Sequence, residues 1–440
     1  METPNSRLPG FHKLTIEDRR KAIAERAGMS IEELVAALEG GGLTPSMAHN
    51  FVENVIGTYA LPFAVALNFR VNDHDYLVPM VIEEPSVVAA ASNAAKMVRE
   101  GAGFRAEVDP PLMACQVQLY DVTDVFRGAE RIVAEKESLL EAANLAVPGL
   151  VHRGGGAHYL EVRSPAPDML VVHIYVDCQD AMGANLVNGV AESLGDRLAA
   201  LGGGKLGLRI LSNLADRRCA RIECAIPIEA LATETRTGEQ VADGIVNASR
   251  FAEVDPYRAA THNKGIMNGI DAVCIATGND WRAIEAGAHA FAARSGRYQP
   301  LAIWRRITTE TGGLALHGAL LLPMAVGTVG GTLRVHPTAK LALRLMGVGS
   351  AAELAGVAAS VGLASNLAAL RALVTDGIQK GHMALHARAV AAAAGATNGE
   401  VERVAVMMVE ARNITVEGAT RALQVIRSGE GANGQNSRER

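Results

Sequence analysis

Runs of apolar residues in the first hundred positions predict two strands followed by a helix. Residues 63–69 and 76–82 are mostly apolar and predict strands, and a helical pattern follows at 87–98. A Glu-Glu-Pro-Ser sequence joins the second strand to this helix. Because proline favours the first helical position, we expect Glu84 at the start of the helix and Ser86 in its first turn. Glu84 could simply complement the helix dipole, or it could act as a general acid.

The pattern between residues 112 and 211 predicts a separate unit. It indicates a strand, a helix, two strands, a helix and a strand at 113–122, 125–146, 159–162, 170–176, 185–201 and 206–211. This order is the split βαβ arrangement of ferredoxin-like domains. The second helix starts at the small residues 180–185, which could bring backbone N–H groups against a phosphate or form an ordinary tight turn. The unit is expected to be inserted into a larger domain.

A dense group of polar residues between 255 and 281 is the strongest candidate for a functional site. Its members are Arg258, His262, Asn263, Lys264, Asn268, Asn279 and Asp280. The apolar run 272–277 between them predicts a short buried strand flanked by loops that hold functional side chains. Two solvated turns around a core strand would give the same pattern. At this point the functional and the purely structural interpretation both stay open.

Composition restricts the class of protein. The chain has 440 residues, which exceeds one hydrophobic core and predicts two or three domains. With 49% apolar and 20% charged residues it is expected to be globular, and the net charge of −5 gives no general reason to bind nucleic acid or an anionic membrane. The 5 cysteines lack CxxC spacing, and no secretory signal is visible. We therefore expect free thiols in a cytoplasmic protein.

Three further patterns are set aside. The uncharged segment 311–333 is long enough to span a bilayer, but its glycines, proline and histidine are typical of strands and turns. The G-x-G-x-x-A sequence at 347–352 lacks a following acidic residue and has helical surroundings, which argues against a Rossmann fingerprint. His382 and His386 lack the glutamate of H-E-x-x-H and a third ligand, so no metal is expected. A histidine on an apolar helix is more often structural than catalytic.

Taken together, six motifs in register resemble the 3-hydroxy-3-methylglutaryl-coenzyme A (HMG-CoA) reductase family. They are Glu-Asn-Val-Ile-Gly at 53–57, Glu-Glu-Pro-Ser at 83–86, Asp-Ala-Met-Gly-Ala-Asn at 180–185, Thr-His-Asn-Lys-Gly at 261–265, Gly-Asn-Asp at 278–280 and Gly-His-Met at 381–383. The likeness runs from about residue 7 to about residue 426. The soluble bacterial class II branch fits best, because no membrane anchor is visible before the catalytic part.

The resemblance implies an α+β protein with a large mixed α/β domain, an inserted ferredoxin-like nicotinamide-binding domain and a helical C-terminal flap. The large domain would comprise 1–109, which binds HMG-CoA, and 217–378. The small cofactor-binding domain would occupy 110–216, and the flap 379–440. Family members place their active sites at a homodimer interface, and class II enzymes often form hexamers. No nucleic acid or membrane partner is implied.

The resemblance also implies four catalytic residues. Lys264 would stabilise the oxyanion formed when hydride attacks the thioester and later the mevaldehyde carbonyl. Glu84 would donate a proton to the developing alcohol. Asp280 would sit beside Lys264 and couple its protonation to that of Glu84. His382, on the flap, would protonate the departing CoA thiolate, while the closed flap retains the aldehyde and excludes water.

Binding residues follow from the same motifs. The substrate-contacting positions would be Ser86, Arg258, Asn213 and Asn268. Among these, Arg258 is the natural partner of the free carboxylate of the HMG group. The cofactor-binding positions would be Asp180, Met182, Gly183 and Asn185. The implied ligands are HMG-CoA, mevalonate, CoA and NAD(H) or NADP(H), with no metal.

The implied reaction interconverts HMG-CoA and (R)-mevalonate plus CoA by two hydride transfers, through enzyme-held mevaldehyde and mevaldyl-CoA. The class II likeness favours NADH. However, the segment 144–153 contains no Asp or Glu to bind ribose hydroxyls, and His152 and Arg153 could accept a 2′-phosphate. The alternatives are a CoA-thioester acyltransferase, or a non-catalytic CoA-binding protein on the same fold. The direction used in the cell, reductive or oxidative, does not follow from the sequence.

Overall fold

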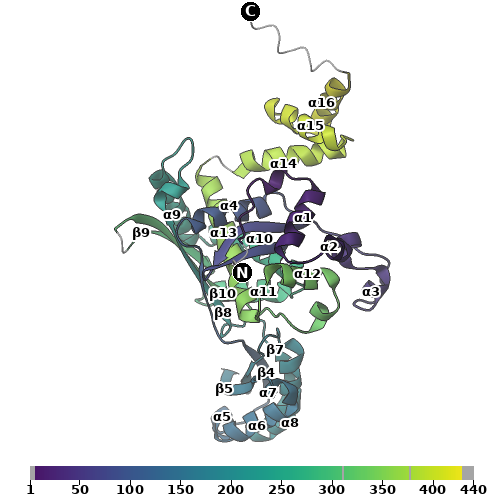
Figure 1. The fold of residues 1–440 in the computed structure, drawn as a ribbon. Helices are drawn as coiled ribbons and strands as arrows, with labels where there is room; N and C mark the ends of the chain where they lie inside the picture. The colour runs from purple at the N-terminus through teal and green to yellow at the C-terminus, as the bar shows by residue number, and fades with distance from the viewer. Residues whose placement is uncertain (1–4, 310–311, 376–377, 429–440) are drawn as a thin grey trace, which may run out of the picture.

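The protein is described by a computed structural model over residues 5–309, 312–375 and 378–428, with side chains except at 332, 334, 378–385 and 398. Figure 1 shows the unit of residues 112–211, called the small unit below, at one end of the molecule. The C-terminal helices α14 to α16 lie at the other end, and the largest part of the molecule lies between them. Three groups of strands and several long helices build these parts.

The N-terminal part contains short helices and a two-stranded sheet. Its elements are η1 (Phe11–Lys13), α1 (Ile16–Arg26), α2 (Ile31–Leu38), η2 (Glu39–Gly42), α3 (Pro45–His49), β1 (Phe63–Val71), β2 (His74–Val81) and α4 (Val87–Arg99). β1 and β2 pair antiparallel, and α4 packs on β1. The predicted strands and helix are thus present, but Pro85 does not open α4. Ser86 is instead its N-cap, with a left-handed φ of 74°.

A four-stranded antiparallel sheet forms the centre of the largest part. Its strands are β3 (Arg105–Val108), β8 (Cys219–Pro227), β9 (Ala302–Thr308) and β10 (Leu314–Pro323), in the order β3-β8-β10-β9. The neighbouring η3 (Ile228–Leu231) and α9 (Gly238–Val254) pack beside it. Trp304 of β9 is fully buried, and its indole nitrogen donates to the Asn366 side chain at 2.7 Å.

The small unit contains a second four-stranded sheet, and its elements have the predicted connectivity. Its elements are β4 (Leu112–Tyr120), α5 (Val125–Ala134), α6 (Lys136–Ala146), α7 (Pro148–Val151), β5 (Gly156–Ala166), β6 (Met169–Asp177), α8 (Ala184–Gly202) and β7 (Lys205–Leu211). All pairs are antiparallel, in the order β5-β6-β4-β7, which is the strand order of a split βαβ unit. The single helix expected at 125–146 is two helices that meet at Glu135, whose backbone is not helical.

Long helices cross the centre of the molecule. They are α10 (Pro256–Ala276), α11 (Trp281–Ala292) and α13 (Ala351–Val374). The prediction of a strand at 272–277 is wrong, because residues 272–276 form the last turns of α10. α10 begins with Asp255 as N-cap and Pro256 in its first turn. A short apolar run does not distinguish a strand from a helix that is buried on several sides, and α10 packs against α4, α9, α11 and α13.

The remaining helices follow η4 (Gly331–Arg334) and are α12 (Pro337–Met346), α14 (Ile378–Ala393), α15 (Asn398–Glu410) and α16 (Val416–Ser428). The last three share a small core that includes Ala391, Val404 and Met408. Gly347 ends α12 in a left-handed conformation, so the G-x-G-x-x-A sequence joins two helices. α13 is long and apolar enough to cross a membrane, but most of it is buried inside the protein, as in a core helix.

Candidate active site

Lys264 and Glu84 form the centre of the candidate site. The Lys264 Nζ lies 2.6 Å from the Glu84 Oε2, and the Asn268 side-chain amide donates to the same oxygen at 3.3 Å. Lys264 and Asn268 are one helical turn apart on α10, so both face the same side. The structure therefore joins two motifs that are separated by 180 positions in the chain.

The pair is open to solvent. The side chain of Lys264 is 59% exposed and that of Glu84 is 34% exposed. An exposed ion pair contributes at most about 1 kcal/mol to stability. Stabilisation of the fold therefore does not account for the position of this pair at the start of α4, and a role in catalysis explains it better.

The local backbone positions Glu84 beside α10. The chain leaves β2, passes Pro85 and enters α4 at Ser86, which is a non-glycine residue with a φ of 74°. A left-handed conformation costs an L-residue about 1–2 kcal/mol. Such strain is often found at functional sites, and here it lies two residues from the carboxylate.

Other predicted substrate residues lie in different places. Arg258 is in the first turn of α10, where its backbone N–H donates to Asp255 and burial lowers the pKa of its guanidinium. Asn213 lies between β7 and β8 and is exposed, and its carbonyl oxygen packs against Gly287 of α11.

Asp280 is the N-cap of α11. Its carboxylate accepts a hydrogen bond from the Ala283 N–H at 3.1 Å and pairs with Arg282 at 3.7 Å. Lys264 and the end of α10 at Ala276 are twelve residues apart, about 18 Å along the helix axis. Asp280 and Asn213 thus belong to a second group around α11, separate from the group around Glu84.

His382 lies on α14, but its side chain is outside the part of the chain that the structure describes. Its predicted role on the flap therefore stays a prediction.

The segment predicted to bind the cofactor has the features of an anion site. Gly183 is the N-cap of α8 with a φ of 101°, and a Cβ there would collide with the Cys178 sulfur. Among the described residues, no side chain caps this helix and its first turn contains no acid. The first N–H groups of α8 are therefore available to a phosphate group, which fits a dinucleotide. Met182 precedes the cap, and Asn185 is exposed in the first turn.

Asp180 is fixed by the backbone around it. One of its carboxylate oxygens accepts from the Ala351 N–H at 2.8 Å, and its carbonyl accepts from the Thr328 N–H at 2.9 Å. This carboxylate anchors the segment to the start of α13, so its place is structural in this conformation.

A large cavity was missed by the sequence analysis. It measures about 1120 Å³ and lies between the N-terminal segment, β1, α4 and the end of α10. Its basic lining residues are Arg7, His12, Arg19, Arg20 and Lys96. The concentration of basic residues between positions 7 and 20 was a signal that could have indicated it.

A half-buried polar chain between α10 and α11 was also missed. The carboxyl groups of Asp271 and Glu285 are hydrogen-bonded, Glu285 lies 2.5 Å from the His289 Nε2, and the His289 Nδ1 lies 2.7 Å from the Tyr298 hydroxyl. The Asn263 amide donates to that hydroxyl at 3.0 Å and returns the chain to α10. Burial, and then the hydrogen bond with Glu285, raises the pKa of Asp271 to about 8. The polar chain ties α10 to α11.

Comparison with known proteins identifies the class. A family model described as hydroxymethylglutaryl-coenzyme A reductase matches residues 15–387. The 3-hydroxy-3-methylglutaryl-coenzyme A reductase of Archaeoglobus fulgidus is 48% identical over 427 residues, 96% of this chain and 95% of the relative. The probable reductase of Borreliella burgdorferi is 35% identical over 391 residues, 86% and 87% of the two chains.

Solved structures agree. The Streptococcus pneumoniae HMG-CoA reductase has a TM-score of 0.80 and 44% identity, covering 95% of this chain and 99% of that one. A class II structure from the same organism, bound to NADPH in open conformations, has a TM-score of 0.80 and 45% identity over 83% of this chain and 99% of that chain. The fold and site thus define a nicotinamide-dependent oxidoreductase acting on a CoA thioester. The chain belongs to the hydroxymethylglutaryl-coenzyme A reductase family.

The resemblance, the α+β fold class and the class II likeness predicted from the six motifs are confirmed. The function that these comparisons support is the interconversion of HMG-CoA and mevalonate plus CoA, and they do not favour an acyltransferase or a non-catalytic protein. The use of a nicotinamide cofactor is supported, whereas the choice between NADH and NADPH is not decided.

Proposed function

We propose that this reaction takes place at the Lys264–Glu84 pair. The observation that carries the proposal is the 2.6 Å contact between the ammonium and the carboxyl oxygen, on an exposed helix face of a reductase fold. An ammonium group at this place can stabilise the oxyanion that develops on a thioester or aldehyde carbonyl. A bound nicotinamide supplies or accepts the hydride.

Glu84 is the proposed proton donor and acceptor. When it is protonated, its hydroxyl can donate to the developing alkoxide that Lys264 stabilises. Asn268 donates to the same carboxyl oxygen and so fixes its orientation. His382 would protonate the CoA thiolate from the flap, which also excludes water.

Substrate and cofactor groups are assigned to the remaining predicted residues. We place the free carboxylate of the HMG group at Arg258, because a guanidinium can bind a carboxylate through two parallel hydrogen bonds. Ser86 and Asn213 would complete the substrate contacts. The cofactor would be held by Met182, Gly183 and Asn185 at the start of α8, with Asp180 keeping the segment in place.

We propose that a complete site needs two copies of the chain. Glu84, Lys264 and Asn268 form one group, whereas Asp280 and Asn213 lie around α11, which begins beyond the end of α10. That end is about 18 Å from Lys264 along the helix axis. In a symmetric dimer the second group of one copy can complete the first group of the other, and each contact is made twice. A trimer of such dimers would give a hexamer.

Mixed dimers test this arrangement. Lys264→Ala and Asp280→Asn should each be inactive. After mixing and reassembly they should regain about one quarter of wild-type activity, because half of the dimers are mixed and each has one intact site. A mixture of Lys264→Ala with Glu84→Gln is the matched control and should stay inactive. Equal recovery in both mixtures, or in neither, would contradict the shared site.

The basic cavity is the proposed place of the CoA nucleotide. α4 begins beside Glu84, and its residues Val88, Ser92 and Lys96 line the cavity over about 12 Å of helix. An extended pantetheine arm can follow such a helix from the reacting thioester to the basic residues, which match the phosphates of CoA. Lys96→Gln should raise the KM for HMG-CoA without changing the KM for free mevaldehyde.

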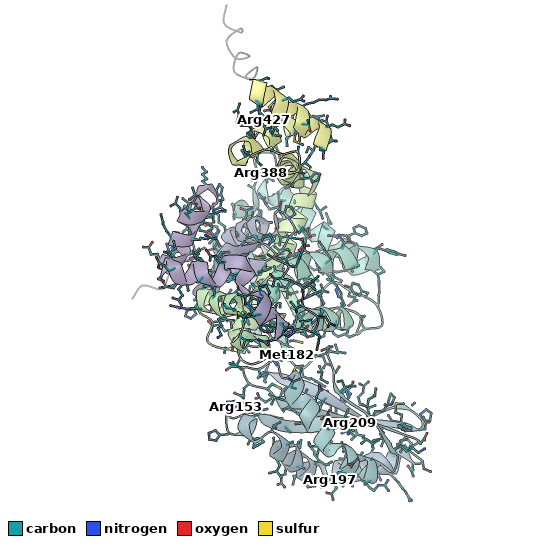
Figure 2. All side chains as sticks on the ribbon, turned by 90° about the vertical axis from the view of Figure 1, so that its right-hand side faces the viewer. Arg153, Met182, Arg197, Arg209, Arg388 and Arg427 are labelled. Atoms are coloured by element: carbon teal, nitrogen blue, oxygen red, sulfur yellow. The ribbon has the colours of Figure 1, made fainter. Side chains whose placement is uncertain are left out.

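NADH is the proposed cofactor, with NADPH as the alternative. Within 144–153 the Asn144 amide oxygen is occupied by the Ala157 N–H at 2.7 Å, whereas His152 and Arg153 are exposed. Figure 2 shows Arg153 at the surface of the small unit. The Streptococcus pneumoniae complex contains NADPH, so class II likeness alone does not select NADH. Arg153→Ala should weaken NADPH use specifically if that residue accepts a 2′-phosphate.

The domain division at 110–216 is also proposed. β3 and β8 are paired neighbours, with Glu107 opposite Arg221, so the chain leaves and re-enters the same sheet around the small unit. Residues 1–109 and 217–378 would form the large domain and 379–440 the flap, in a cytoplasmic enzyme.

The experiment that tests the function is the oxidation of mevalonate with CoA, followed by the absorbance of reduced nicotinamide, with NAD and NADP in parallel. Turnover with either cofactor supports the proposal, and their ratio gives the preference. Absence of turnover with both, and also with HMG-CoA and reduced cofactors, would contradict it.

A further inference from the structure

Three segments that are distant in the sequence meet where the small unit joins the rest of the molecule. They are residues 180–183, Arg218 just before β8, and residues 326–329 after β10. Figure 2 shows Met182 at this junction. The first of these segments is the one proposed to bind the cofactor.

Arg218 is buried at the junction, with 2% of its surface exposed. Its Nη1 donates to the Ala181 and Met182 carbonyls, both at 3.2 Å, and its Nη2 donates to the Val326 carbonyl at 2.5 Å. All three acceptors are backbone carbonyls, so no carboxylate neutralises the charge by a direct hydrogen bond among the described residues. Burying a charge in this way is costly, which indicates a role that a neutral side chain would not perform. The planar guanidinium can bridge two segments at fixed spacing.

Asn279 holds the same loop from the opposite side. Its Oδ1 accepts from the Gly327 N–H at 2.7 Å, and its Nδ2 donates to the Gly327 carbonyl at 3.1 Å. The peptide group between Val326 and Gly327 is therefore held at both ends, by Arg218 at its carbonyl and by Asn279 at its N–H.

Gly327 brings this peptide group into direct contact with the cofactor segment. A Cβ at this position would lie 2.6 Å from the Met182 nitrogen and 3.0 Å from the Asp180 carbonyl oxygen. The next residue, Thr328, donates its N–H to that carbonyl at 2.9 Å. Two backbones touch here without any side chain between them, and only glycine permits that approach.

We propose that Arg218 and Asn279 are positioning residues that hold the Val326–Gly327 peptide group, and through it fix the cofactor segment at the start of α8 against the large part of the molecule. The inference rests on the proposed function of this segment in binding a nicotinamide cofactor. Arg218 and Asn279 lie behind the segment and act through its backbone. They set the place of the cofactor relative to the large part of the molecule, and they do not contribute to the affinity for HMG-CoA.

The clamp can be loosened in three independent ways. Arg218→Lys keeps the charge but removes the planar guanidinium whose two nitrogens donate to both segments. Asn279→Ala releases the N–H end of the peptide group. Gly327→Ala forces the two backbones apart. Each variant should weaken NADH or NADPH binding by about tenfold, because displacements near 1 Å are sufficient for large losses. HMG-CoA binding to the cofactor-free enzyme should stay within about twofold of wild type. The double variant Arg218→Lys/Asn279→Ala should lose little more than the worse single variant, because both residues hold one peptide group.

Two control variants separate positioning from general damage. Gly189→Ala adds a methyl group to an exposed position of α8 with nothing within 4 Å. Arg99→Lys weakens a largely buried ion pair with Asp75. Both residues are distant in sequence from the three segments of the junction. Neither should change cofactor affinity, although Arg99→Lys should lower the melting temperature.

The measurements are cofactor fluorescence titration, HMG-CoA calorimetry and thermal melting on the full-length protein. Unchanged cofactor affinity in the clamp variants that fold, or equal losses of cofactor and HMG-CoA affinity, would overturn the inference while wild-type turnover leaves the proposed function intact. A wild-type protein that binds neither nicotinamide would overturn both.

Discussion

Lys264 and Arg218 are cations in opposite environments. Lys264 is 59% exposed along its side chain and meets the Glu84 carboxylate at 2.6 Å, whereas Arg218 is 2% exposed and its hydrogen bonds among the described residues end on carbonyls. A cation that acts on a substrate must remain reachable and needs a partner that can exchange a proton. A cation that positions the backbone can be buried, because its partners never change. The comparison separates the chemistry of the site from the framework that holds it.

Lys264→Ala should cause the largest loss of activity among the variants of these two cations. We expect kcat to fall by about a thousandfold or more in both directions, because the oxyanion loses its preorganised cation. The melting temperature should hardly change, since the ion pair is exposed. Steady-state kinetics and thermal melting measure both quantities. Retained turnover would contradict the assignment of Lys264.

Arg218→Met should lower stability, which Lys264→Ala should leave almost unchanged. Removing the guanidinium leaves three carbonyl groups without their donor, so we expect the free energy of unfolding to fall by about 3 kcal/mol. Urea denaturation measures this loss, with Lys264→Met as the matched substitution at the exposed cation. A similar small change in both variants would show that burial does not distinguish the two cations.

His382→Gln tests the residue that is proposed to protonate the CoA thiolate. Steps that form or use the CoA thiolate should slow by about a hundredfold, because a general acid is lost. Reduction of free mevaldehyde to mevalonate should be spared, since it involves no thiolate. The two rates are measured with HMG-CoA and with mevaldehyde as substrates. Equal losses in both assays would instead indicate a structural histidine.

Asp271→Asn tests the half-buried carboxyl between α10 and α11 through the pH dependence of stability. Burial raises the folded-state pKa of Asp271 from 3.8 to about 8, so the folded protein keeps a proton that the unfolded chain has lost. Stability should therefore fall as the pH rises from about 4 to about 8. His289, whose pKa is raised by its hydrogen bond with Glu285, acts in the same direction as the pH rises.

In the variant this decline should be shallower, by up to about 1.4 kcal/mol per pH unit. Thermal melting between pH 5 and pH 8.5 checks it against Glu253→Gln, a carboxylate whose pKa is lowered by Arg305. An identical slope in the wild type and in Asp271→Asn would rule out the retained proton.

Much of the architecture could be predicted from local patterns. The alternation of strands and helices between 112 and 211 was sufficient for the order of the small sheet, because each element carries its own periodicity. The error at 272–277 arose because a helix packed on several sides has no polar face, and its short apolar run then has the composition of a strand. The break at Glu135 was missed since two consecutive amphipathic helices continue one periodic pattern.

The sequence by itself determined the family, through six short motifs in register, and with it the residue types that can perform the reaction. Only the tertiary structure decided which of these residues meet. It brings Glu84 to Lys264 across 180 positions and leaves Asp280 at the start of α11, beyond the far end of α10. It also buries Arg218, which no local pattern distinguishes from the exposed Arg217 beside it. The physical reason is that burial and contact depend on packing between distant segments, whereas periodicity and motifs report only on neighbours along the chain.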